Sequence, residues 1–269
     1  SIECCQSHPM AVCRQAIGGI DVENNAADAF ALSGQAFADD LADWAKIAPH
    51  LYLWDYTTNF SNYLQPFHNW HVIGENLRLF RRLGVEGVLE QGNYAPGKAS
   101  AFAPLRIYLL SRLLWNTDAD TDELIRTFVR GYYGAEAETG VLQCLSLMEN
   151  AASQTHMGIY DMPDATYLDE GLIEQADGCL ADALSLTADP LRRERLERER
   201  LSFAYVRLAR LPMDAPGRSE RIDAFAERLS RLGVTELFER RELAGSIQCM
   251  KESRCARRRE NVPYGCYRL

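Results

Sequence analysis

The sequence lacks the patterns that identify a membrane protein or a nucleic-acid-binding protein. No run approaches the roughly 20 apolar residues that a membrane-spanning helix requires, and no basic segment followed by an apolar one opens the chain. The formal net charge of −9 provides no positive field to attract phosphates, and glutamates interleave the arginine-rich stretch Leu191–Arg200, as on a solvated helix face. We therefore expect neither a membrane nor a nucleic acid as a partner.

Motifs for cofactors are also missing. The eight cysteines include no pair with the C-x-x-C spacing that is typical of zinc and redox sites. Neither G-x-G-x-x-G nor G-x-x-x-x-G-K-[ST] occurs, so no glycine-rich loop for a nucleotide phosphate is predicted. We expect no metal and no cofactor.

The first part of the chain alternates between strands and helices. The 269 residues are 47% hydrophobic and 25% charged, a composition typical of one large or two ordinary globular domains. Strand-like segments at Ser1–Cys5, Leu51–Trp54 and Val85–Glu90 alternate with helical patterns, two of which end at Pro49 and Gly84. This alternation predicts parallel βα units over residues 1–116.

The second part, residues 117–269, shows helical periodicity without strand-like segments. Asp120 or Thr121 is placed to cap one helix, and apolar spacing typical of helices recurs over Leu172–Ala183 and Ile222–Leu232. An all-α domain is therefore predicted here. Because the chain opens with Ser1 inside a strand-like segment, we also expect it to be a piece of a longer protein.

Each predicted strand delivers a carboxylate. Glu3, Asp55 and Glu90 follow the apolar residues of the three strands. In a (β/α)8 barrel the functional residues lie at the carboxyl ends of the strands, and parallel strands place these ends on the same side. We therefore expect the three carboxylates to open onto one concave face.

The segments that leave the second and third strands combine aromatic rings with amides. A sugar site uses flat apolar faces, amides for the hydroxyls and commonly two carboxyl groups for cleavage. Asp55 and Glu90 are the candidate catalytic pair, and the amides after Glu90 are expected to keep it ionised more readily than Asp55, as a base. The candidate saccharide-contacting residues are Glu3, Trp54, Tyr56, Asn59, Asn62, Gln91, Asn93 and Tyr94.

Structural explanations are open for each of these residues. A carboxylate at a strand end can cap a helix or pair with an arginine, and Trp54 can be a core residue. The histidines in nearby loops can be solvated side chains instead of bases or ligands. These histidines are His8, His68 and His71.

Four segments resemble a known family. "SIECCQSHPM", "LYLWDYTTNFSNYLQPF", "GVLEQGNY" and "LLWNTDADTDELIRTFVRGYYG" are similar to a bacterial domain family of unassigned function, found in multidomain proteins that resemble α-glucuronidases and other TIM-barrel glycoside hydrolases. The resemblance covers about Ser1 to Leu211. It implies that the barrel begins upstream, that the general acid lies there, and that Asp55 and Glu90 occupy the positions of carboxylates that activate water.

Together these observations predict an α/β region followed by an all-α region: about three βα units from the C-terminal portion of a (β/α)8 TIM barrel, then a helical domain. The predicted function is that of a glycoside-hydrolase-like protein acting on a glycan or uronic-acid-containing saccharide, with the isolated piece inactive and poorly stable. A non-catalytic carbohydrate-binding or scaffold module is one alternative, and a structural helical interaction domain is another. The sugar, the linkage, the oligomeric state and the compartment, whether bacterial cytoplasm, periplasm or outside the cell, stay open.

Overall fold

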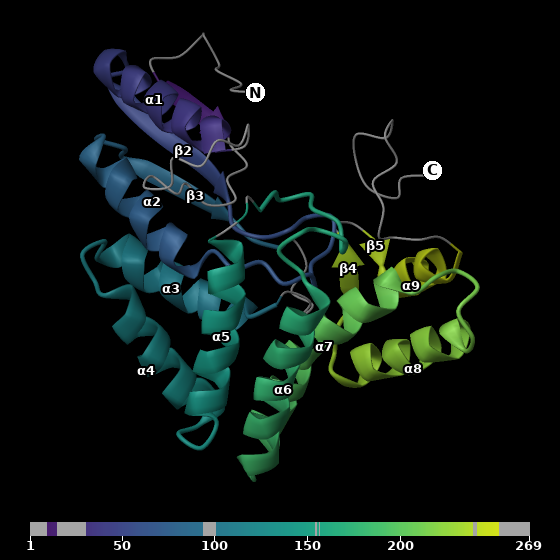
Figure 1. Ribbon diagram of the computed structural model, residues 1–269. Helices are drawn as coiled ribbons and strands as arrows, with labels where there is room; N and C mark the ends of the chain where they lie inside the picture. Colours follow the sequence, from purple (N-terminus) through teal and green to yellow (C-terminus); the bar gives the residue numbers. More distant parts are fainter. Residues whose placement is uncertain are drawn as a thin grey trace.

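The computed structural model describes residues 10–14, 31–93, 101–153, 155, 157–238 and 241–252 (Figure 1). Its first half alternates strands with helices, as the sequence predicts. The elements in chain order are β1 (Met10–Arg14), α1 (Ala31–Ile47), β2 (His50–Tyr56), α2 (Trp70–Arg82), β3 (Gly87–Gln91) and α3 (Ala103–Trp115).

The three strands form a parallel sheet in the order β1-β2-β3. The strand order never reverses, and crossovers between parallel strands are right-handed, so α1 and α2 must cover the same face of the sheet. Figure 1 shows both helices on one side of the strands. The sheet therefore has a helix-covered face and, in the part of the chain that is described, a helix-free face.

Local signals explain where these elements end. Helix α1 stops at Ile47, two residues before Pro49, which lacks the backbone N–H that a continuing helix needs. Helix α2 is followed by Gly84, whose φ of 77° lies in the left-handed region that favours glycine. Helix α2 begins at Trp70, which is the first residue of its buried stripe.

The second half is mainly helical. It contains α4 (Thr121–Tyr133), α5 (Glu138–Ala152), α6 (Glu170–Leu186), α7 (Pro190–Arg210), α8 (Arg218–Arg231) and α9 (Leu243–Glu252). The side chain of Asp120 accepts a hydrogen bond from the Glu123 N–H and caps α4, which confirms the predicted cap. The prediction of helices alone is wrong in one detail, because β4 (Glu236–Phe238) and β5 (Arg241–Glu242) form a short antiparallel pair.

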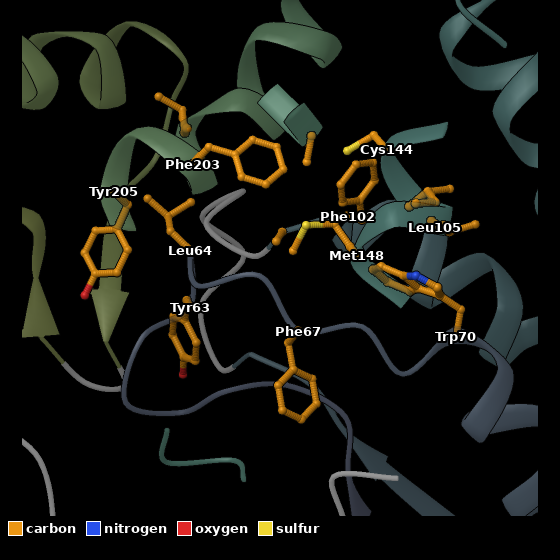
Figure 2. Packing of buried hydrophobic residues seen from close by; sticks show 14 of the residues in the cluster. Tyr63, Leu64, Phe67, Trp70, Phe102, Leu105, Cys144, Met148, Phe203 and Tyr205 are labelled. Carbon is orange, nitrogen blue, oxygen red and sulfur yellow. The ribbon is translucent and has the colours of Figure 1, made fainter. Parts of the chain in front are cut away.

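One hydrophobic core continues across residue 116. The segment between β2 and α2 places Tyr63, Leu64 and Phe67 in the same buried cluster as Phe203 and Tyr205 of α7 (Figure 2). The backbone N–H of Tyr63 also donates to the Leu237 carbonyl of β4, at 2.9 Å. The helical half therefore packs directly against the segment that leaves the second strand.

The predicted strands Leu51–Trp54 and Val85–Glu90 are confirmed as β2 and β3, with bounds shifted by one or two residues. The expected strand Ser1–Cys5 lies outside the described residues, and β1, five residues further on, was not predicted. Among the described residues, no helix is both long enough and apolar enough to cross a membrane.

Candidate functional site at the strand ends

Asp55 and Glu90 lie side by side in the sheet. They are directly paired between β2 and β3, so both side chains leave the sheet on the same face. The side chain of Asp55 is 6% exposed and accepts hydrogen bonds from the Tyr56 N–H, at 2.7 Å, and from the amide of Asn76 on α2. The structure thus brings the two predicted carboxylates together and turns them toward the helix layer.

Burial raises the pKa of both carboxyl groups. For Asp55 the hydrogen bonds from Tyr56 and Asn76 act in the opposite direction, and for Glu90 the negative charge of Asp55 raises the pKa further. The hydrogen bonds that favour ionisation fall on Asp55, so this geometry does not support the expectation that Glu90 is the more readily ionised partner, which stays a prediction. The pair holds one negative charge more easily than two.

The helix-free face carries a row of aromatic residues. Burial alternates along β2: Leu51, Leu53 and Asp55 are buried, whereas the intervening Tyr52, Trp54 and Tyr56 are half-buried. Their side chains therefore point away from α1 and α2. Because every second residue of a strand lies on the same face, Tyr52, Trp54 and Tyr56 form one row.

Two contacts tie this row to β3. The indole Nε1–H of Trp54 donates to Oε1 of Gln91, at 2.7 Å. A Cβ placed on Gly87 would lie 2.7 Å from Cδ1 of Tyr52, so the tyrosine ring lies directly over this glycine. Next to the row, both the N–H and the hydroxyl of Thr57 donate to the Gln91 carbonyl.

Asn59 and Asn62 are not available to a saccharide in this structure. Both are fully buried, and the Nδ2 of each donates to the carbonyl of Asp161, at 2.8 and 3.1 Å. The Oδ1 of Asn59 accepts the N–H of Asn62, and the Oδ1 of Asn62 accepts the hydroxyl of Tyr205. The expectation that they contact sugar is corrected: they fasten the segment after β2 to the helical half.

The histidines have two different environments. His68 is buried, and burial together with the nearby Arg106 guanidinium lowers its pKa to about 3, so it is neutral at ordinary pH. His71 on α2 is hydrogen-bonded to Glu149 of α5 and to Asp122 of α4, which raises its pKa to about 9. His71 therefore joins three helices as a cation.

Three candidate residues lie outside the described part of the chain, namely Glu3, Tyr94 and His8. Asn93 follows β3 and is half-buried. Across the described ranges, no group of three or more histidine, cysteine, aspartate or glutamate side chains could hold a metal ion.

Sequence reasoning missed two buried ionisable side chains, Arg106 and Glu199. Arg106 of α3 lies over the Trp70 ring and donates to the Asn69 side chain and the Phe67 carbonyl. Glu199 of α7 is buried as well, and the two opposite charges act on each other's pKa. The sequence signal that could have revealed them is Arg106, which stands on the otherwise apolar face of α3.

A family assignment covers this site. The family described as "Domain of unknown function (DUF4838)" matches residues 8–145, just over half of the chain. The chain belongs to this family. The DUF4838 region contains all three strands of the parallel sheet, helices α1 to α4 and the start of α5, and therefore both the carboxyl pair and the aromatic row. A comparison with curated proteins found no match.

Proposed function

We propose that this chain is part of a carbohydrate-active, glycoside-hydrolase-like protein, and that its saccharide lies across the helix-free face at the ends of β2 and β3. The observation that carries the proposal is the aromatic row Tyr52, Trp54 and Tyr56, with Gln91 tied to it by a hydrogen bond. Aromatic faces pack on the apolar C–H faces of sugar rings, and a side-chain amide supplies both a donor and an acceptor for hydroxyl groups. Glycan or uronic-acid-containing saccharides are the proposed ligands.

The arrangement of strands and helices supports the C-terminal portion of a barrel similar to that of α-glucuronidases. In a doubly wound sheet the strand order reverses and helices cover both faces, whereas here the order does not reverse. Apolar side chains of β3 and of the end of α3 also remain uncovered, with Leu89 49%, Leu114 47% and Trp115 92% exposed. Further βα units beside β3 would cover them. In a closed barrel the helix-free face is the inner face, so the aromatic row would line the interior.

Hydrolysis by Asp55 and Glu90 is the second candidate function. It is favoured by their raised pKa values, since a carboxyl group that stays protonated near neutral pH can act as an acid while its partner stays ionised. The orientation of the pair opposes it, because the contact with Asn76 of α2 places Asp55 on the helix-covered face. Saccharide binding by the aromatic row is therefore the function that the geometry supports best.

The binding proposal is tested with two tryptophan variants. Binding of cellohexaose, xylohexaose and a glucuronic-acid-substituted xylo-oligosaccharide would be measured by titration calorimetry for the wild type, Trp54→Ala and Trp115→Ala. We expect Trp54→Ala to weaken binding at least about tenfold, or about 1.4 kcal/mol. The matched control Trp115→Ala removes an exposed tryptophan of α3 and should bind like the wild type. Equal losses in both variants, or no saccharide binding by the wild type, would contradict the proposed site.

The hydrolytic candidate has its own test. Glu90→Gln and Asp55→Asn keep the shape of each side chain and remove its charge. Loss of a general acid or base lowers the rate by about 10²–10⁴ while ground-state binding is largely kept. Unchanged turnover in an active enzyme would remove that residue from the mechanism, and binding without any turnover would favour the carbohydrate-binding or scaffold module.

A further inference from the structure

Gln91, the last residue of β3, is held at both its main chain and its side chain. Its backbone carbonyl accepts two hydrogen bonds from Thr57, one from the N–H at 2.9 Å and one from the hydroxyl at 3.1 Å. Its side-chain Oε1 accepts the indole Nε1–H of Trp54 at 2.7 Å. Because an indole nitrogen can only donate, the acceptor in this contact must be the amide oxygen. The orientation of the Gln91 amide is therefore fixed.

The amide nitrogen of Gln91 is the group that this arrangement leaves for a ligand. Within the described residues, Nε2 makes no hydrogen bond, and the Gln91 side chain is only half-buried. An amide nitrogen of this kind carries two donor hydrogens. Gln91 is directly paired with Tyr56 on β2, so its side chain leaves the sheet on the face of the aromatic row. A saccharide that lies on the row would meet a hydrogen-bond donor there.

Thr57 is itself held by buried side chains. It is 2% exposed, and its carbonyl accepts the Nδ2 of Asn69 at 3.3 Å. The Oδ1 of Asn69 accepts the Nε–H of Arg106 on α3 at 3.2 Å, and both of these residues are buried as well. A continuous series of hydrogen bonds, each between described residues, thus runs from α3 through Thr57 to Gln91 and Trp54.

We propose that Gln91 is a specificity-determining residue of the saccharide site, which donates through Nε2 to an oxygen atom of the sugar, and that Thr57 is the positioning residue that holds Gln91 in this orientation. This inference rests on the proposed function for its ligand. The recognised atom is a hydroxyl, ring or glycosidic oxygen, which neutral oligosaccharides carry. A side chain at position 91 that accepts but cannot donate would hold Trp54 and bind the saccharide more weakly.

The variant Gln91→Glu separates the donor from the contact with Trp54. An ionised carboxylate still accepts the indole N–H, but it has no hydrogen to donate. Affinity for cellohexaose and xylohexaose, which are neutral, would be measured by titration calorimetry with the whole chain. We expect Gln91→Glu to bind about fivefold to tenfold more weakly, the effect of one lost hydrogen bond. The control Gln175→Glu adds the same charge at an exposed position of α6 and should bind like the wild type.

The role of Thr57 is tested through Gln91. Thr57→Val keeps the shape of the side chain and removes its hydroxyl donor, whereas Thr57→Ser keeps the donor. Thr57→Val should bind about threefold to fivefold more weakly and shift the indole N–H resonance of Trp54 in nuclear magnetic resonance spectra, and Thr57→Ser should stay within about twofold of the wild type. In a Gln91→Ala background, Thr57→Val should cause no further loss, because the residue through which it acts is gone.

Three results would contradict this inference. Unchanged affinity in Gln91→Glu would overturn the donor role and leave saccharide binding by the aromatic row standing. Equal losses from Thr57→Val in the wild-type and Gln91→Ala backgrounds would overturn the positioning role. If the wild type binds neither neutral oligosaccharide, the inference fails, and the proposed function fails with it only if the glucuronic-acid-substituted xylo-oligosaccharide does not bind either.

Discussion

The paired carboxyl groups Asp55 and Glu90 predict an unusual dependence of stability on pH. Their pKa values are raised, to about 7 and about 8, above the ordinary carboxyl range near 4. In the folded protein the pair therefore holds more protons than in the unfolded chain once the pH exceeds about 4. Stability contributed by the protonated pair is present below that pH and is lost as the pH rises toward 8. The variant Glu90→Gln should remove the part of this loss that comes from Glu90 and from its repulsion of Asp55.

The magnitude follows from the register of the sheet. Asp55 and Glu90 are direct neighbours on adjacent strands, and such strands lie about 4.8 Å apart. Two unit charges about 5 Å apart repel each other by about 3 kcal/mol at an effective dielectric constant near 20. This repulsion corresponds to roughly two pKa units, in the direction that the structure gives. Glu90→Gln should therefore be more stable than the wild type by about 2–3 kcal/mol at pH 9 and by much less at pH 5.

Urea denaturation followed by circular dichroism at pH 5, 7 and 9 would measure the difference between the two proteins. Using a difference cancels the contributions of other titrating groups. Glu86→Gln is a suitable control, because Glu86 is an exposed carboxylate just before β3 whose pKa is lowered by hydrogen bonding to His50. The control should show no gain in relative stability with rising pH. A constant difference between wild type and Glu90→Gln, or a variant less stable than the wild type at pH 9, would refute the reasoning.

Three further predictions concern stability. His71 carries a pKa raised to about 9, so His71→Gln should cost about 1 kcal/mol in urea titrations below pH 6.5, and this cost should disappear above about pH 10. Asn62→Ala should lower the free energy of unfolding by about 2–4 kcal/mol, because buried partners lose their hydrogen bonds; a loss below about 0.5 kcal/mol in the same assay would contradict this role. Gly140→Ala should lower the free energy of unfolding by about 1–3 kcal/mol, since its Cβ would lie 2.6 Å from a carbonyl oxygen of α6. Gly178→Ala meets no atom within 4 Å and should raise the free energy of unfolding by about 0.5–1 kcal/mol. Equal shifts of the melting temperature in the two variants would rule out the close packing of α5 on α6 at Gly140.

Signals that act over a few residues predicted several local features of the fold correctly. The strand β2 follows from its short apolar run, the end of α2 from Gly84, and the cap of α4 from Asp120. Each of these depends on backbone geometry or on a hydrogen bond within a single turn. The positions of Asp55 and Glu90 in the sheet were predictable for the same reason, because parallel strands align their carboxyl ends.

The partners of the polar residues could not be predicted in this way. Asn59 and Asn62 have the composition of a sugar site, but their partners lie about 100 residues downstream and bury them. The face on which Asp55 lies depends on which side the helices cover, which the strand sequence alone does not state. Glu199 stands in a run of charged residues whose other members are mostly on or near the surface, and only its packing against α3 shows that it is buried.

The dependence of the segment after β2 on distant residues also bears on how the chain acquires its structure. Asn59 and Gln65 reach acceptors that lie 102 and 97 residues later in the sequence, and contacts of such separation slow folding because a long loop must close before they form. The acceptors at Asp161 and Met162 lie beyond residue 145, where the DUF4838 match ends. Residues 8–145 made alone would therefore expose these amides to water, and the segment that leaves the second strand would be among the last parts of the chain to reach its final conformation.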